Sequence, residues 1–198
     1  MKKSLLLLLL LPLVAASGFA QESRQDVSVS GSGLFPPYIA GDAVNLHNNP
    51  AKGVLASYRY LLTPSNGVEV NYQYAQEVDH FTNPTNNVRV HVRFQEFSGA
   101  LVHSFSFRNW NPFVEAGPAG FMIRPIDDAV TSLQGLTGNT NVGLVYGGGF
   151  AYEISPSFDI RAEYRGLVMK TPTFGQTNFS TGRYYNISDP VIGIAYHF

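Results

Sequence analysis

The chain has 198 residues, with 13 Lys and Arg against 14 Asp and Glu, so its formal net charge at pH 7 is −1. This balance gives no support for a nucleic-acid partner, and a chain without cysteine has no disulfide framework and no cysteine for a lipid anchor. Only 14% of the residues are charged, whereas 11 are Tyr and 14 are Phe, which is typical of an all-β protein.

The first twenty residues have the three parts of a secretory signal peptide. Two lysines precede an apolar run from Leu5 to Val14, and small residues lead to Ala20. The run holds about ten apolar residues and contains Pro12, so it is shorter than the roughly twenty residues of a membrane helix. We therefore predict that residues 1–20 are removed and that residues 21–198 form one domain.

Eight later segments alternate apolar and polar residues with the period of two that is typical of strands. They are Asp26–Gly33, Gly53–Leu62, Val68–Gln76, Val88–Phe105, Pro112–Ile123, Asn141–Ile154, Phe158–Val168 and Val191–Phe198. In the fourth segment the alternation changes phase near Glu96, which predicts a β-bulge. Pro118 in the fifth segment has no N–H to donate, which predicts a kink or bulge there.

The connections between these segments are alternately long and short. The long ones are Leu34–Lys52, Glu77–Asn87, Arg124–Thr140 and Met169–Asp189, and the short ones are Thr63–Gly67, Ser106–Asn111 and Ser155–Ser157. This alternation predicts an up-and-down meander with long loops on one side and tight turns on the other. Because the apolar faces would meet lipid, we predict an all-β fold, an eight-stranded antiparallel up-and-down transmembrane β-barrel in the cell outer membrane.

Three stretches, the terminal residue Phe198 and the signal peptide carry a family resemblance, and the stretches are Asn111–Gly117, Gly147–Glu153 and Asp159–Arg165. With them the sequence resembles the small eight-stranded outer-membrane barrels related to the OmpA transmembrane domain, the outer-membrane β-barrel domain family. The resemblance implies contact with outer-membrane lipid and lipopolysaccharide. It implies no particular activity, because the family includes adhesins, structural proteins, small pores and a few enzymes.

The last segment places four large apolar residues on one face: Ile192, Ile194, Tyr196 and Phe198. They fit the family's assembly signal, so the resemblance implies that the barrel-assembly machinery recognises this strand. Aromatic residues near the short turns predict an outer girdle at one membrane interface. These residues are Tyr58, Tyr60, Phe113, Phe158, Tyr196 and Phe198.

The opposite faces of the segments carry charges that would point into the lumen. They are Glu69, Arg89, Arg93, Glu115, Glu153, Asp159, Arg161, Glu163 and Arg165. An eight-stranded barrel is only wide enough for side chains to fill, so we expect opposite charges to pair across strands. Small inward residues such as Gly147, Gly149 and Gly193 would leave room for them. The network could be a fixed plug or a gate that opens a narrow path.

The histidines give little support for chemistry. His103 and Ser104 are adjacent, so on a strand they face opposite sides and cannot act together. The five histidines also lack the spacing of a metal-ligand set. We therefore expect no cofactor and no enzymatic activity.

The leading hypothesis is a structural or adhesive outer-membrane barrel whose surface loops contact ligands. The alternatives are a narrow pore for water, ions or small solutes, a lipid-directed hydrolase, and a soluble periplasmic barrel that binds an apolar ligand.

Overall fold

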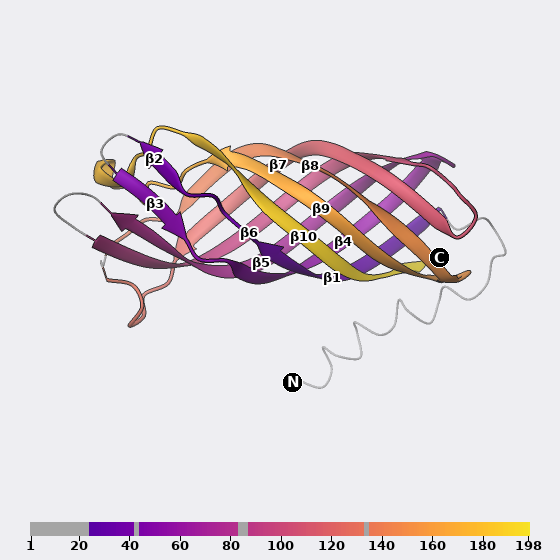
Figure 1. The fold of residues 1–198 in the computed structure, drawn as a ribbon, viewed down its shortest axis with the longest axis horizontal. Coiled ribbons are helices and arrows are strands. Elements are labelled where there is room, and N and C mark those ends of the chain that lie inside the picture. The colour runs from indigo at the N-terminus through magenta and orange to yellow at the C-terminus, as the bar shows by residue number, and fades with distance from the viewer. Residues whose placement is uncertain (1–23, 42–43, 83–86, 133–134) are drawn as a thin grey trace, which may run out of the picture.

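The computed structural model describes residues 24–41, 44–82, 87–132 and 135–198, and the predicted signal peptide lies outside them. Eight antiparallel strands form a closed barrel (Figure 1). They are β1 (Gln25–Leu34), β4 (Ala51–Thr63), β5 (Asn66–Thr82), β6 (Asn87–Ser104), β7 (Trp110–Pro125), β8 (Asn139–Ser155), β9 (Phe158–Lys170) and β10 (Tyr184–His197). Pairing of β5 with β6 and of β1 with β10 closes the wall. The predicted fold is confirmed.

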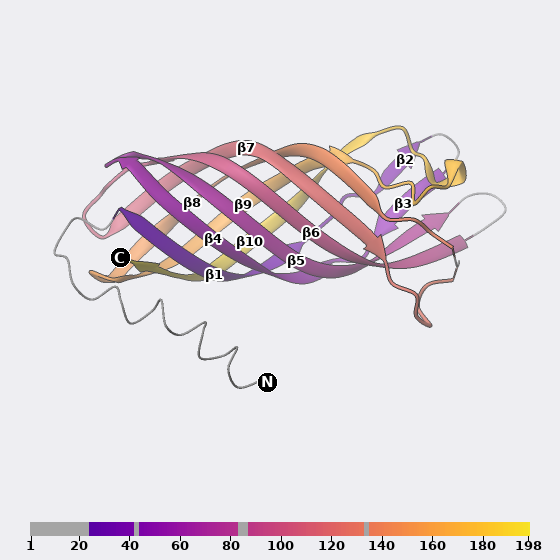
Figure 2. The same ribbon diagram turned by 180° about the vertical axis from the view of Figure 1, so that it is seen from behind.

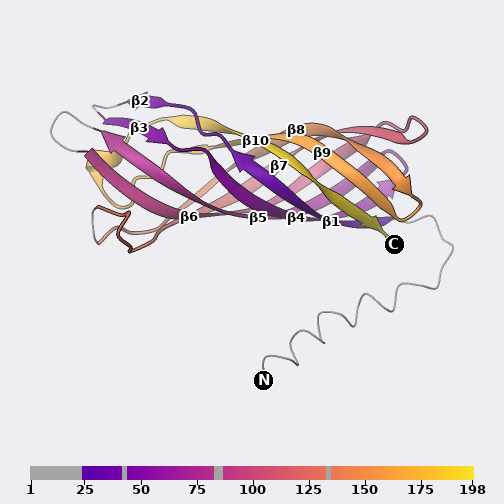
Figure 3. The ribbon, with the colours of Figure 1, turned by 60° about the horizontal axis from the view of Figure 1, so that its bottom comes forward.

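Three smaller elements lie at the end of the barrel that is distant from the C-terminus (Figure 3). Strands β2 (Ile39–Gly41) and β3 (Val44–Asn48) form a hairpin, and β3 pairs with the end of β5. A 3₁₀ turn, η1 (Thr177–Phe179), precedes β10. Within the described ranges, no helix combines the length and the apolar character that crossing a membrane requires.

The barrel has two parts that differ in which face is apolar. In the part near the short turns, which we call the belt, the outward side chains are apolar. Exposed examples are Val29, Val54, Val70, Phe97, Leu101, Val114, Val142, Leu144, Ile160, Ile192 and Ile194. In the part near the long connections, which we call the head, the outward side chains are mainly polar. The head comprises residues 34–41, 44–51, 75–82, 87–95, 121–132, 135–140 and 167–187.

Strand β6 shows the change between the two parts. Val92 and Phe94 in its head portion face inward and are fully buried, whereas Phe97 and Leu101 in its belt portion face outward. The β5–β6 register nevertheless runs without a shift from Asn66–His103 to Thr82–Asn87. The predicted β-bulge near Glu96 is therefore wrong: the polarity of the two faces reverses there, while the strand itself stays regular.

Pro118 interrupts the ladder without changing its register. Ser98 pairs with Ala119 and Leu101 with Ala116, which is one continuous register, while the two pairs between them are missing. This is the expected effect of a residue without an N–H. No bulge is present between these strands.

An apolar core fills the head. Phe81 of β5 stacks on Phe179 at 4.4 Å between ring centroids and makes a T-shaped contact with Phe174 at 5.9 Å. Leu46 of the hairpin and Phe121 of β7 are also fully buried in this core. The segments 171–183, 34–41 and 44–48 thus pack over the end of the barrel as folded structure.

The head also corrects the predicted strand boundaries. Within the segment Glu77–Asn87, predicted as a long loop, residues 77–82 belong to β5 and Asn87 to β6, and the first long connection contains the β2–β3 hairpin. Strand β10 begins at Tyr184, well before Val191. In the head most outward side chains are polar and most inward ones are apolar, which is the reverse of the belt. A rule that expects an apolar outer face therefore mistakes these regular strands for loops.

Candidate functional site

The interior of the belt is charged, and we consider it the first candidate site. Alternate residues of the barrel strands face inward and are buried. The charged ones are Asp26, Arg59, Glu69, Glu96, Glu115, Asp159, Arg161, Glu163, Arg165 and Asp189. The carboxylates outnumber the guanidinium groups in this set, and the set as a whole comes from seven different strands.

One cluster lies toward the short turns and has Glu69 at its centre. Arg59 Nε donates to Glu69 Oε2 at 2.6 Å, and Arg161 Nη1 lies 3.5 Å from the same oxygen. Arg161 Nη2 also donates to Asp26 Oδ1 at 2.9 Å. The guanidinium groups of Arg59 and Arg161 lie 4.5 and 5.7 Å from the centroid of the Phe113 ring, within the range of cation–π attraction. This cluster links β1, β4, β5, β7 and β9 across the lumen.

A second cluster lies toward the head and is organised by one arginine. Arg165 Nη2 donates to Glu96 Oε1 at 2.5 Å and Nη1 donates to Asp189 Oδ2 at 3.2 Å, while Nε lies 3.6 Å from Glu115 Oε1. Gln73 Nε2 donates to the same Asp189 oxygen at 2.9 Å. The Arg165 side chain is fully buried. Because its partners come from β6, β7 and β10, this arginine connects three other strands of the barrel to β9.

Small residues beside β9 make room for these charges, as the sequence suggested. The register places Gly147 opposite Arg165, Gly149 opposite Glu163, and Gly193 opposite Arg161. A Cβ atom at Gly149 would overlap the carbonyl oxygen of Ala162. The wall at β8 is therefore too close to β9 for a larger residue.

Six of the nine residues predicted for the lumen are buried inside the belt: Glu69, Glu115, Asp159, Arg161, Glu163 and Arg165. Glu153 faces inward at the short-turn end but is half-buried and, among the described residues, belongs to no ion pair. The prediction is wrong for Arg89 and Arg93, which are exposed on the outside of the head. Both arginines lie in the head, beyond the point near Glu96 where the polarity of the two faces reverses. In this part of β6 the outer face is the polar one.

Phe113 is a second correction. We predicted it for the outer aromatic girdle, but it faces inward and is buried beneath Arg59. The fifth segment lacks a regular alternation, so the sequence did not show which side chains of β7 face outward. The other predicted girdle residues are at least partly accessible on the outer face, and Tyr196 packs between Phe158 and Phe198 at centroid distances of 5.1 and 6.0 Å.

Four members of the clusters were missed in the sequence: Asp26, Arg59, Glu96 and Asp189. Asp26 and Arg59 stand on the polar faces of their segments, so the alternation could have identified them. Glu96 stands at the apparent change of phase. Asp189 was placed in a loop because β10 was predicted too short.

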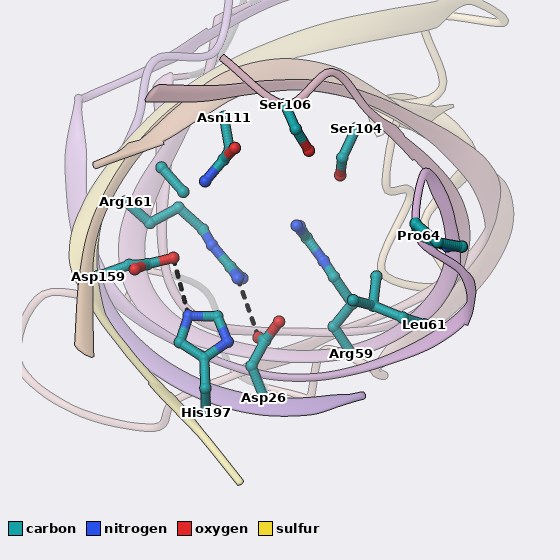
Figure 4. A pocket seen from close by; sticks show the side chains of 11 residues that line it. Asp26, Arg59, Leu61, Pro64, Ser104, Ser106, Asn111, Asp159, Arg161 and His197 are labelled. Carbon is teal, nitrogen blue, oxygen red and sulfur yellow. Dashed lines mark hydrogen bonds and ion pairs between the residues drawn. The ribbon is translucent and has the colours of Figure 1, made fainter. Parts of the chain in front are cut away.

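A cavity of about 140 Å³ opens below the first cluster, and we call it the vestibule (Figure 4). Arg161 points into it from β9 and Arg59 from β4, on two different sides, and His197 Nε2 lies 2.8 Å from Asp159 Oδ2. Ser104 and Ser106 line the side across from His197. A serine nucleophile needs a histidine within hydrogen-bond reach. Among the described residues, no hydrogen bond joins either serine to His197, so these side chains do not form a hydrolase triad.

The outer surface of the head carries a cationic pair. Arg93 of β6 stands directly opposite Arg124 of β7, and both side chains are exposed. Among the described residues, neither of them forms an ion pair with an acidic side chain. His91 on the same face shares a hydrogen bond of 2.6 Å with Asp128 instead.

Comparison with known proteins gives one family and several similar folds. The family model of the outer membrane protein beta-barrel domain matches residues 6–198. Comparison with curated proteins gave no match.

Three solved structures illustrate the similarity of the fold. OprG from Pseudomonas aeruginosa is 12% identical with a TM-score of 0.64, and the match covers 91% of this chain and 99% of OprG. Neisserial surface protein A is 14% identical with a TM-score of 0.63, covering 89% and 98%. Ail of Yersinia pestis is 15% identical with a TM-score of 0.53, covering 90% and 100%. At such identities the likeness concerns the fold alone.

Proposed function

Because the chain belongs to the outer membrane protein β-barrel domain family and resides in the outer membrane, we propose that it is a closed, non-conducting barrel with a structural or adhesive role. In such barrels the short turns face the periplasm and the longer connections face outward, so the head is the cell-surface part. The outer membrane location excludes the soluble periplasmic alternative.

The closed lumen is the observation that carries this proposal. An ion entering from the vestibule meets the Arg59 and Arg161 cluster and then the Arg165 cluster. Beyond them, fully buried Phe94 and Phe121 lie in the apolar core of the head. A hydrated ion would have to displace buried ion pairs and then cross an apolar layer, and both steps cost free energy.

Planar-bilayer recording tests this proposal against the narrow-pore alternative. We expect folded protein, checked by heat-modifiable migration on a gel, to give no unitary conductance across the voltage range that the bilayer tolerates. A reproducible conductance that changes in Arg165→Ala would show that the arginine clusters are a gate and that the barrel is a pore.

We further propose that the cationic pair contacts phosphate groups of lipopolysaccharide. Two like charges directly opposite each other on a sheet destabilise it, and an anion between Arg93 and Arg124 would remove this repulsion. The pair stands just above the apolar belt, at the level expected for lipid headgroups. Ail, a barrel of similar fold, has been solved in complex with the heparin analogue sucrose octasulfate, which is another polyanion.

Binding of lipid A vesicles by the double variant Arg93→Gln/Arg124→Gln tests this contact. We expect weaker binding with a smaller dependence on salt, because two cations are removed. Lys170→Gln, an exposed cation at the end of β9, is the matched control. Equal binding by the double variant and the control would reject the contact, and competition by sucrose octasulfate would show that the pair also accepts sulfated glycans.

The terminal strand supports the proposal that the barrel-assembly machinery recognises this chain. Ile192 and Ile194 are 64% and 57% exposed on the outer face of β10, and Phe198 follows them on the same face. We expect deletion of Phe198 to reduce the amount of heat-modifiable barrel in the outer membrane while export stays unchanged. Normal assembly of the truncated chain would contradict a role for this residue.

A further inference from the structure

The interior of the head contains a polar group that the lumen clusters do not include. Asn48 of β3, Glu77 and Asp79 of β5, and Tyr185 of β10 are 3%, 3%, 1% and 6% exposed. Their surroundings are the apolar core of the head, and the outward positions at this level carry Gln76, Arg93 and Lys170. These four side chains therefore lie above the belt.

The sheet brings three of the four side chains together on the inward faces of β3 and β5. Asn48 stands directly opposite Asp79 in the β3–β5 register, and Glu77 lies two residues from Asp79 on the same inward face. Tyr185 of β10 is buried in the same apolar core as Leu46 and Phe81, which neighbour Asn48 and Asp79 on the inward faces of β3 and β5.

Their polar atoms lack partners. Among the described residues, no hydrogen bond reaches either oxygen of Asp79, Oε2 of Glu77, the side-chain amide of Asn48 or the hydroxyl of Tyr185. Within the same ranges, no Lys or Arg forms an ion pair with Glu77 or Asp79, because the three buried arginines pair with other acids. Two carboxylates buried side by side can both ionise only beside a positive partner.

We propose that these four side chains bind one Ca²⁺ ion inside the head. All the donors are oxygens, with two carboxylates, a side-chain amide and a phenol, which is the chemistry of a hard cation. Ca²⁺ accepts irregular arrangements of six to eight oxygens, whereas Mg²⁺ retains several of its waters and fits a dry core poorly. The buried amide of Asn48 and the buried hydroxyl of Tyr185 have no partner among the described residues, and both are independent of the acidic pair. The ion would fasten the β2–β3 hairpin to β5 and β10.

Calcium titration of the folded, lipopolysaccharide-free barrel after treatment with a chelator tests the proposal. We expect one saturable Ca²⁺ ion per barrel, with a Kd on the order of 10⁻⁴ to 10⁻³ M, as in other extracellular modules, and a melting temperature that rises with Ca²⁺ concentration. Asp79→Asn should weaken the binding at least tenfold. Asp128→Asn, which removes an exposed acid of the head, should leave it unchanged. Equal binding by wild type and Asp79→Asn, or no binding by wild type, would overturn the proposal.

A matched pair of tyrosine variants keeps the test decisive if Asp79→Asn folds poorly. Tb³⁺ replaces Ca²⁺ in oxygen sites and emits when a neighbouring tyrosine is excited. Tyr185→Phe removes one hydroxyl from the site, while Tyr184→Phe alters its exposed neighbour on β10. We expect Tyr185→Phe to lose the saturable, Ca²⁺-displaced emission and Tyr184→Phe to keep it. The same emission from both variants would place the bound ion elsewhere.

Discussion

The belt and the head use the same strands with opposite polarity. On β6, Phe97 and Leu101 of the belt are 50% and 69% exposed on the outer face, whereas Val92 and Phe94 of the head are buried on the inner face. The interior of the belt holds Arg165 among carboxylates, while the interior of the head holds Phe81 among other aromatic rings. Figures 1 and 2 show that the strands run uninterrupted through both parts.

This contrast indicates that the surrounding medium decides which face is apolar. In lipid, the outer face must be apolar, and the narrow lumen accepts charges only when they pair. In water the usual rule returns, and apolar side chains fill the interior. The change occurs within a few residues at Glu96, without any break in the β5–β6 register.

Arg165→Ala should have the largest effect, because it breaks the belt's interior. The substitution leaves Glu96, Asp189 and Glu115 without their shared cation in a buried site. Removing one partner of a buried ion pair costs about 3–5 kcal/mol of unfolding free energy. Urea unfolding in lipid vesicles measures this change. Lys170→Ala on the same strand is the control, for which we expect a change below about 0.5 kcal/mol.

Phe81→Ala should break the head while sparing the belt. It removes a fully buried ring that packs on Phe174 and Phe179, at a cost of about 3–5 kcal/mol. Hydrogen exchange should rise at Leu46 and its neighbours in β3, while the belt strands stay protected. Phe107→Ala, an exposed residue at the other end, serves as the control. Faster exchange throughout the belt would show that the two parts unfold together.

Two substitutions on one face of β6 should sharpen the boundary between the parts. Leu101→Lys places a charge on the lipid-facing side of the belt, which costs about 2–4 kcal/mol near the middle of the bilayer. Arg93→Leu, on the same face within the head, should change stability by less than about 0.5 kcal/mol. Unfolding in vesicles compares them. Similar costs for both variants would mean that the apolar belt extends to Arg93.

The sequence was sufficient for the barrel and for much of its interior. Strict alternation in the segments around Glu69 and Arg161 placed those residues inside. The sequence did not identify two partners of Arg165. Glu96 is 69 residues away along the chain and stands where the alternation changes phase, and Asp189 lies in a segment that was predicted as a loop. The prediction of the head failed for a different reason. We expected one face of each strand to be apolar along its whole length, whereas on β6 the apolar face is the outer one in the belt and the inner one in the head.

The smallest effect concerns an exposed turn on the head. Asp128 accepts hydrogen bonds from the backbone N–H groups of Val130 and Thr131 at 2.9 and 3.2 Å and shares one with His91. The hydrogen bond with His91 is the main cause that lowers the pKa of Asp128 below its ordinary value of 3.8, and the two backbone bonds add to it. A carboxyl whose pKa is lower in the folded state stabilises the fold above its unfolded pKa, and this contribution is lost as the pH falls through the lower folded value.

The turn should therefore be ordered at pH 7 and loosen below about pH 4. Amide exchange at Val130 and Thr131, corrected for the intrinsic pH dependence of exchange, measures this loss. Asp128→Asn should remove the pH dependence, whereas Asp127→Asn, the neighbouring acid, should retain it. Because the turn belongs to the head alone, exchange in the belt should stay constant over the same range. A parallel change in belt and head would mean that the turn reports global unfolding and that the two parts are not independent at acidic pH.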